Sequence, residues 1–263
     1  IEDKVSQAVR NQYEENPYPR WINTGLSNKP KTIRQVLQAI KVHHNLDVQQ
    51  LSNKPDILVA GCGTGQHALS TASRFVNCNV LAMDLSLSSL SYARRKTREL
   101  GITNIEYMQG DILKLNQLEK QFDIIESAGV LHHMEDPLAG WKVLVDRLRT
   151  GGLMYVGLYS DVSRQHIVKA RRHIAKKKYT TSPDDIRKFR QEIINMDLNS
   201  DSEITKVIGS RDFYSLSTCR DLLFHVQEHR FTLPQIEMAL NDFGLRFLGF
   251  ELKQSRIMSF SEF

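Results

Sequence analysis

An apolar run that ends in three glycines at alternate positions constrains this chain more than any other feature. Residues 57–65 have the sequence Ile-Leu-Val-Ala-Gly-Cys-Gly-Thr-Gly, and a helical pattern begins at Gln66. The pattern predicts a buried strand, a tight turn and a helix whose N-terminus faces the space above the turn. Glycine lacks a Cβ and adopts positive φ, so backbone there can approach a ligand closely. Because the first N–H groups of a helix attract anions, we expect a nucleotide-like cofactor above this turn.

The pattern that follows predicts an α/β fold with a doubly wound, mostly parallel sheet. Strands are expected at 57–60, 79–83, 104–108, 122–126 and 153–158, and helices at 66–75, 87–99 and 137–148. Strands that alternate with helices of about 10–15 residues are typical of right-handed βαβ units. The strands are continuous apolar runs, which is typical of strands buried on both faces.

Three further strand ends bring polar side chains to the same edge as the glycine turn. The second strand ends in Asp84, whose carboxylate can accept hydrogen bonds from the two hydroxyls of a ribose. The third is followed by Asp111 and Ile112, an acid and an apolar residue suited to a flat base, and the fourth leads into 127–133. A dinucleotide fingerprint would need glycine at position 66, where this chain has Gln66, and this argues against NAD or FAD.

With these features the chain resembles the class I S-adenosylmethionine-dependent methyltransferases over about residues 50–160. The resemblance rests on Gly61-Cys62-Gly63-Thr64-Gly65, Asp84, Asp111, Phe122-Asp123-Ile124-Ile125 with Val130-Leu131-His132-His133, and Arg149-Thr150-Gly151-Gly152-Leu153. It implies a sheet of the seven-stranded type, S-adenosylmethionine as cofactor, and direct transfer of a methyl group to a nucleophile. The product of such a transfer is S-adenosylhomocysteine.

The resemblance also implies which residues contact the cofactor. The glycine turn lies under the methionine and ribose parts, Asp84 holds the ribose hydroxyls, and Asp111 holds the adenine amino group with Ile112 against the ring. The full set of expected contacts is Gly61, Cys62, Gly63, Thr64, Gly65, Gln66, Asp84, Leu85, Asp111, Ile112 and Ser127, with Tyr18 and Arg20 from the N-terminal segment.

Val59 departs from the pattern of the family, which usually has an acid two residues before the first glycine. That acid helps to hold the amino group of the methionine part, so another group must supply the contact. We expect an N-terminal lid to cover the site, with Tyr18 or Arg20 at the methionine carboxylate and Trp21 near the substrate. The alternative is that these aromatic residues only dock an N-terminal helix, expected at 2–14, on the sheet.

Two histidine groups are candidates for handling the methyl acceptor. His132 and His133 lie beside the expected transfer position, and a histidine there could take a proton from the nucleophile, although such residues also simply shape pockets. His225 and His229 belong to an H-x-x-E-H sequence on an expected helix at 217–229, a spacing also found in zinc peptidases. We favour a polar helix face over a metal site. This face would line a substrate pocket with Arg211 and Tyr214.

Composition and charge narrow the remaining possibilities. The chain has 263 residues, 41% of them hydrophobic and 25% charged, and no apolar run near the ~20 residues that span a bilayer. Three widely spaced cysteines, Cys62, Cys78 and Cys219, form no disulfide or zinc pattern and favour the cytoplasm. Of the net charge of +5, residues 161–190 carry ten basic and three acidic residues. With few aromatics and no nucleic-acid motif there, we expect a solvated helical face and no nucleic-acid partner.

The expected organisation has four parts. Residues 1–45 form the N-terminal helical and lid segment, 46–160 the cofactor-binding core, 161–241 a helical insertion on the substrate side, and 242–263 a return strand at 245–252 with a truncated end. Since the chain begins at Ile1, we expect it to be part of a longer protein. The acceptor, a protein side chain or a small molecule, stays open, as does the oligomeric state. The alternatives are a catalytically silent S-adenosylmethionine-binding module and an NAD-dependent oxidoreductase.

Overall fold

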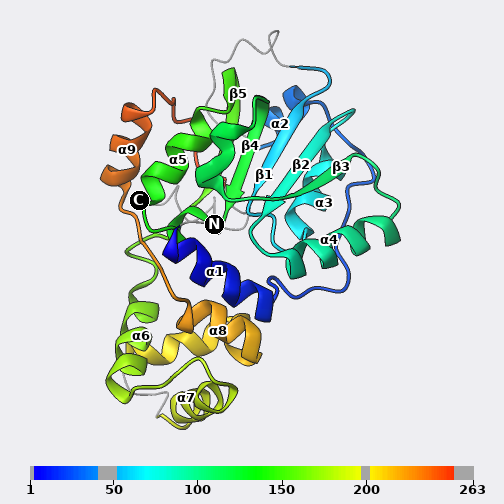
Figure 1. Cartoon of the computed structure of the whole chain (residues 1–263). Coiled ribbons are helices and arrows are strands. Elements are labelled where there is room, and N and C mark those ends of the chain that lie inside the picture. Colours follow the sequence, from blue (N-terminus) through cyan, green and yellow to red (C-terminus); the bar gives the residue numbers. More distant parts are fainter. Residues whose placement is uncertain (1–2, 41–51, 197–201, 252–263) are drawn as a thin grey trace.

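A five-stranded parallel sheet with the order β3-β2-β1-β4-β5 forms the centre of the molecule. The computed structural model describes residues 3–40, 52–196 and 202–251 (Figure 1). The strands are β1 (Asp56–Ala60), β2 (Asn79–Asp84), β3 (Ile105–Gln109), β4 (Phe122–Ala128) and β5 (Leu148–Gly157). Every neighbouring pair is parallel, which confirms the predicted fold class.

Helices cover both faces of this sheet, because the apolar side chains of β1 and β2 alternate between the two faces (Figure 1). One face packs against α2 (Ile33–Ile40), α3 (Gln66–Arg74) and α4 (Leu87–Glu99), and the other against α5 (Pro137–Val145) and α9 (Leu233–Asp242). Side chains cap these helices at their starts: Ser86 accepts a hydrogen bond from the Ser89 N–H at α4, and Asp136 does the same for Leu138 at α5.

A separate helical part with its own core follows β5. It comprises α6 (Gln165–Lys177), α7 (Pro183–Asn195) and α8 (Leu216–Phe224), with the 3-10 helices η4 (Glu203–Gly209) and η5 (Arg211–Tyr214). Phe189 and Phe213 are fully buried at its centre. Helix α1 (Lys4–Glu15) lies between this part and the sheet (Figure 1). The other two 3-10 helices, η2 (Ile112–Gln117) and η3 (Leu131–His133), follow β3 and β4.

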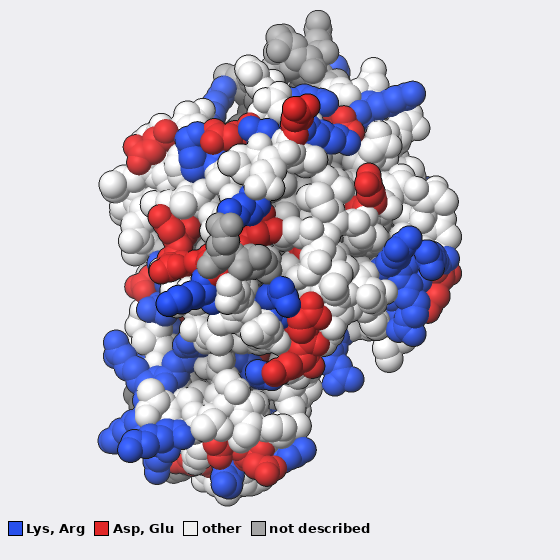
Figure 2. All heavy atoms as spheres, viewed as in Figure 1, with Lys and Arg blue, Asp and Glu red and all other residues white. Residues whose placement is uncertain are grey.

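The basic residues of 161–190 lie on this helical part among acidic partners. Figure 2 shows Lys and Arg side chains over the lower part of the molecule with acidic side chains between them. Lys169 pairs with Glu203, and Lys177 lies 3.6 Å from Glu192. This arrangement is that of a solvated helical face. No helix within the described ranges combines the length and the apolar character needed to cross a bilayer.

Three expected elements differ from the structure. The helix expected at 217–229 ends at Phe224, so His225 and His229 share no helix face. Residues 245–251 form no strand, because no described strand lies beyond β5 to pair with them; residue 252 lies outside the described ranges. Phe247 and Phe250 are exposed and contact each other, with ring centroids 4.9 Å apart. Helix α9, which the sequence placed in the insertion, packs in the sheet core through Ala239.

Candidate functional site

A cavity of 690 Å³ lies at the carboxyl ends of the strands, between the sheet and α1. It is within the size range of small-molecule sites. Ten of the residues expected from the sequence line it: Tyr18, Gly61, Cys62, Gly63, Gln66, Asp84, Leu85, Asp111, Ile112 and His133. The other ten do not: Arg20, Trp21, Thr64, Gly65, Ser127, His132, Arg211, Tyr214, His225 and His229. The structure therefore brings most of the cofactor candidates together but few of the acceptor candidates.

The N-terminal segment is packed directly on the glycine turn. The Thr64 N–H donates to the Tyr18 carbonyl at 3.2 Å, and the Thr64 hydroxyl donates to the Pro19 carbonyl at 2.7 Å. The indole N–H of Trp21 donates to the same hydroxyl at 2.9 Å, so Trp21 anchors the segment and does not face a substrate. Gly63 has φ +52°, and a Cβ there would lie 2.4 Å from the Tyr18 carbonyl oxygen. Glycine is required here because the segment approaches the turn so closely.

The anion-facing groups of this site belong to the start of α3. The N–H groups of Gly61 and Cys62 both donate to the Met83 carbonyl, so the turn itself is satisfied within the protein. The N–H groups of Gln66 and His67 have no hydrogen-bond partner among the described residues, and both residues line the cavity. A helix start with free donors suits a carboxylate.

Two carboxylates, Asp84 at the end of β2 and Asp111 after β3, line the cavity. Asp84 is held in place by the N–H groups of Gly63 (2.7 Å) and Ser86 (2.9 Å), and burial raises the pKa of Asp84. One oxygen of Asp111 caps η2 by accepting from the Leu113 N–H, and its second oxygen has no partner among the described residues. Their spacing along the sheet edge, with Ile112 beside them, fits ribose hydroxyls and an adenine amino group.

An acid that the sequence reasoning missed lies next to the Val59 position. Val59 is buried, and its partner on β4 is Glu126, which is 2% exposed. Glu126 contacts His67 at 2.9 Å and Arg74 at 2.6 Å. Burial pushes the pKa of Glu126 upward, but the bonds and charges of these neighbours hold it below its usual value. His67 lines the cavity and Glu126 does not. The signal was an acid directly after the apolar pair Ile124 and Ile125 in the middle of β4.

The two histidines after β4 have different surroundings. His133 lines the cavity, its Nδ1–H donates to the Gln227 carbonyl at 2.7 Å, and burial lowers its pKa to about 4. His132 lies behind it, stacked on Tyr159 with ring centroids 3.6 Å apart, and burial lowers its pKa to about 2. His132 is therefore removed from the cavity, which contradicts its candidacy as a base. His133 is neutral at pH 7.

The remaining acceptor candidates lie elsewhere. Arg211 and Tyr214 are exposed on η5, outside the cavity. His225 is buried behind His133, with the two rings stacked at 3.6 Å, and burial lowers its pKa to about 2. The side-chain amide of Gln227 lies within hydrogen-bond distance of His229 Nε2, at 2.9 Å. The backbone N–H of His229 donates to the His132 carbonyl at 2.7 Å. These histidines support the wall of the cavity because loop 225–230 folds back on η3.

Sequence reasoning did not identify the acid on α8 that lines the cavity, at an end that we call the acceptor end in view of the proposal below. Asp221 on α8 lines the cavity, is 8% exposed, and accepts a hydrogen bond from the Tyr13 hydroxyl at 2.8 Å. Burial raises the pKa of Asp221 to about 6. Tyr159, which follows β5, lines the same end. The available signal was an acid at a core-facing position of α8, beside Cys219 and Leu223.

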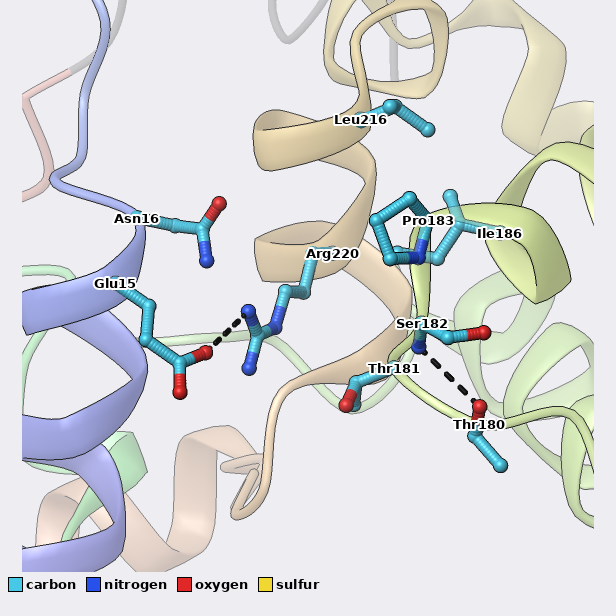
Figure 3. Close-up of a pocket in the computed structure, with 9 residues that line it drawn as sticks. All are labelled: Glu15, Asn16, Thr180, Thr181, Ser182, Pro183, Ile186, Leu216 and Arg220. Atoms are coloured by element: carbon cyan, nitrogen blue, oxygen red, sulfur yellow. Dashed lines mark hydrogen bonds and ion pairs between the residues drawn. The ribbon is translucent and has the colours of Figure 1, made fainter.

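A second, smaller pocket of 460 Å³ lies on the other side of α1 and α8 (Figure 3). Figure 3 shows Arg220 pointing toward Glu15, and these two side chains form a hydrogen bond of 2.8 Å. Ser182, at the start of α7, lies on the opposite side with its hydroxyl turned away from them. This pocket has no glycine turn and no buried acid. Its ion pair fixes α1 against α8, and so holds Tyr13 beside Asp221.

Comparison with known proteins finds similarity to a protein family over part of the chain. Residues 57–152 match the protein family described as Methyltransferase domain. An uncharacterized protein of Synechococcus is 29% identical over 205 residues, which cover 75% of this chain and 48% of that protein. The (S)-coclaurine N-methyltransferase of Papaver somniferum is 28% identical over 107 residues, 41% of this chain and 30% of that enzyme. The chain thus spans about half or less of the length of these relatives.

The fold is shared with a solved structure over nearly the whole chain. PKMT2 from Rickettsia typhi in complex with AdoHcy has a TM-score of 0.68 and 20% identity, and the match covers 93% of this chain and 50% of that protein. The match therefore includes the helical part after β5 as well as the sheet.

Proposed function

We infer that this chain is an S-adenosylmethionine-dependent methyltransferase of class I, with residues 57–152 as its methyltransferase domain. It moves a methyl group to a nucleophile at the Asp221 end of its cavity. The family match confirms the resemblance drawn from the glycine turn, Asp84 and Asp111. The observation that carries the proposal is one continuous cavity with a nucleoside-type end and a buried polar end. When bound, S-adenosylmethionine supplies a methyl group on a positively charged sulfur.

The residues present fit this cofactor. Asp84 would hold the ribose hydroxyls, and the free oxygen of Asp111 the adenine amino group. The free N–H groups at the start of α3 would hold the methionine carboxylate. His67 contacts Glu126, and Glu126 is the β4 partner of Val59, the position where the family usually has an acid. His67 is thus the first group to test at the methionine end.

The N-terminal segment acts as a lid in this proposal. Its support is the pair of bonds from Thr64 to the lid carbonyls and the placement of Tyr18 in the cavity wall. We expect Tyr18→Ala to weaken S-adenosylhomocysteine binding by isothermal titration calorimetry. Arg20→Ala is the matched control, because Arg20 is exposed and lies outside the cavity. Equal affinities for both variants and the wild type would remove the lid proposal.

The central experiment separates the three functions considered from the sequence. Thermal unfolding is measured with S-adenosylmethionine, S-adenosylhomocysteine and NAD, since a ligand at 100 times its Kd stabilises by about 2.7 kcal/mol. A labelled-methyl assay on cell extract, separated into protein, nucleic-acid and small-molecule fractions, then tests turnover. Binding without any labelled product favours the silent module, and stabilisation by NAD alone favours the oxidoreductase.

The acceptor enters between the sheet and the helices of 165–224, which we assign to the substrate side. A protein side chain and a small molecule both stay as candidates, since the relatives include an (S)-coclaurine N-methyltransferase and a release factor glutamine methyltransferase. The cytoplasmic location inferred from the cysteines stays a prediction; all three are buried and free.

A further inference from the structure

The buried carboxylate of Asp221 has no charged partner. Its side chain is 8% exposed and accepts a hydrogen bond from Tyr13, but within the described part of the chain no Lys, Arg or His forms an ion pair with it. The charge of Arg164 acts to lower the pKa of Asp221, but its guanidinium is already paired with Glu228 at 2.7 Å. Burying an unpaired charge costs several kcal/mol. A positively charged ligand that binds beside Asp221 would remove this cost.

Tyrosine side chains surround this carboxylate in the cavity wall. Tyr13, Tyr18 and Tyr159 line the cavity together with Asp221. Tyr159 is rigid, because its ring is stacked on His132 at 3.6 Å and the Arg164 guanidinium lies 3.6 Å from its centroid. Tyr13 donates its hydroxyl proton to Asp221, and its oxygen lies 3.3 Å from Nε2 of His225, so the Tyr13 hydroxyl is engaged from both sides and holds the carboxylate in place. The phenol oxygens of Tyr18 and Tyr159 and the Asp221 carboxylate therefore form a surface that attracts an N–H-bearing cation.

We propose that the methyl acceptor is an alkyl amine that enters as its ammonium form and is bound by Asp221, which Tyr13 holds in place, and by the neighbouring Tyr18 and Tyr159. This proposal rests on the proposed function. An acidic acceptor, such as a carboxylate or a phenolate, is disfavoured because it would be repelled by Asp221. Neutral His133, with its Nδ1–H engaged by Gln227, adds no positive charge that would oppose an ammonium.

The proton and electrons of the transfer can be followed at named atoms. The ammonium gives one proton to the Asp221 carboxylate and becomes a neutral amine. Its nitrogen lone pair forms the new bond to the methyl carbon, while the electrons of the carbon–sulfur bond stay on the sulfur. The positive charge thereby moves from sulfur to nitrogen, and the products are an N-methylammonium and neutral S-adenosylhomocysteine. The pKa of Asp221, raised by burial to about 6, lies close enough to neutrality for it to take up and release this proton.

The amine could be free or carried on a polypeptide, and the test separates these sources. The intact protein is incubated with methyl-labelled cofactor and four probes: n-butylamine, a lysine-containing peptide, the same peptide with serine for lysine, and glutathione as a thiol. We expect label on an amine probe. The preferred amine, free or peptide-borne, identifies the source. Label mainly on the serine peptide or on glutathione overturns the proposal.

Variants connect the result to Asp221. Asp221→Asn keeps the shape and the bond from Tyr13, and we expect it to lower kcat/KM for the amine at least 100-fold with S-adenosylhomocysteine affinity changed less than twofold. Tyr13→Phe is the second variant, with an expected loss of about tenfold. Asp184→Asn, an exposed acid of α7 outside the cavity, is the matched control with no loss. An Asp221→Asn enzyme with wild-type amine kinetics refutes the proposal.

The outcome also distinguishes this proposal from the proposed function. If no probe is labelled, the labelled product of a cell extract is isolated and treated with base, which hydrolyses methyl esters and leaves N-methyl groups intact. Base-stable methylamine supports the proposal, and base-labile or O- and S-methyl product overturns it. No labelled product from extract or probes refutes the proposed function itself, and with it the proposal.

Discussion

Replacing Asp221 by asparagine should stabilise the protein although it removes a hydrogen-bonded side chain. Asparagine has nearly the same volume, and its side-chain oxygen can still accept the bond from Tyr13, which spans 2.8 Å in the structure. What disappears is a buried charge that has no counter-ion among the residues that the structure describes. A residue that serves only the fold would show the opposite sign on substitution, so the experiment separates a functional acid from a structural one.

The magnitude follows from the pKa of Asp221. Burial raises it from 3.8 to about 6. A difference of one pKa unit is worth about 1.4 kcal/mol, so the charged form costs the native state ~3 kcal/mol relative to the unfolded chain. Below about pH 4 the group is protonated in both states and the cost vanishes. The advantage of Asp221→Asn therefore grows as pH rises from about 4 to 6 and is constant above that.

Urea unfolding of both proteins at several pH values between 4 and 8 tests this reasoning. The difference in the free energy of unfolding between the variant and the wild type cancels the contributions of all other titrating groups. We expect a value near zero at pH 4 and up to ~3 kcal/mol in favour of the variant at pH 7. A variant that is less stable than the wild type at pH 7, or a difference independent of pH, would refute the account.

Three further substitutions test other parts of the site. Gly63→Ala should destabilise by more than ~1 kcal/mol and weaken S-adenosylhomocysteine binding, because its Cβ meets the Tyr18 carbonyl at 2.4 Å and φ is +52°; an unchanged melting temperature would contradict this. Asp111→Asn should weaken the same ligand about tenfold by calorimetry, ~1.4 kcal/mol, with little effect on unfolding; unaltered affinity would argue against the adenine contact. Glu126→Gln should lower stability by roughly 3 kcal/mol at pH 7, because it leaves the buried contact with His67 without its charge. Since the pKa of Glu126 is depressed in the fold, that loss should shrink as pH falls below about 4.5 in urea unfolding, and a loss that persists in acid would count against it.

The gathering of the glycine turn, Asp84 and Asp111 at one cavity was predictable because each of these parts is local in sequence. A strand, a glycine turn and a helix start follow one another within residues 57–66, and parallel pairing brings Asp84 and Asp111 to the same edge. Nothing beyond alternation and the direction of the strands was needed to place these carboxylates. The sequence pattern therefore carries the cofactor class.

The acceptor end was not predictable for the opposite reason. Tyr13 and Asp221 are 208 positions apart, and their bond depends on how α1 packs against α8. The histidines attracted attention by their chemistry, yet His132 and His225 are buried as packing for the cavity wall. The pattern at 245–252 had strand-like residues but no described neighbour to pair with, since strand propensity acts only where a partner strand lies alongside.

Three successive residues of α1 are bonded to three different places. Tyr13 reaches Asp221, Glu14 accepts from the N–H groups of Leu87 and Ser88 at the start of α4, and Glu15 pairs with Arg220. A rotation of the helical part against the sheet must therefore turn about this helix end. The Asp221 end of the cavity is therefore linked through α1 to the start of α4, and we expect a substitution that frees α1 to loosen both places at once.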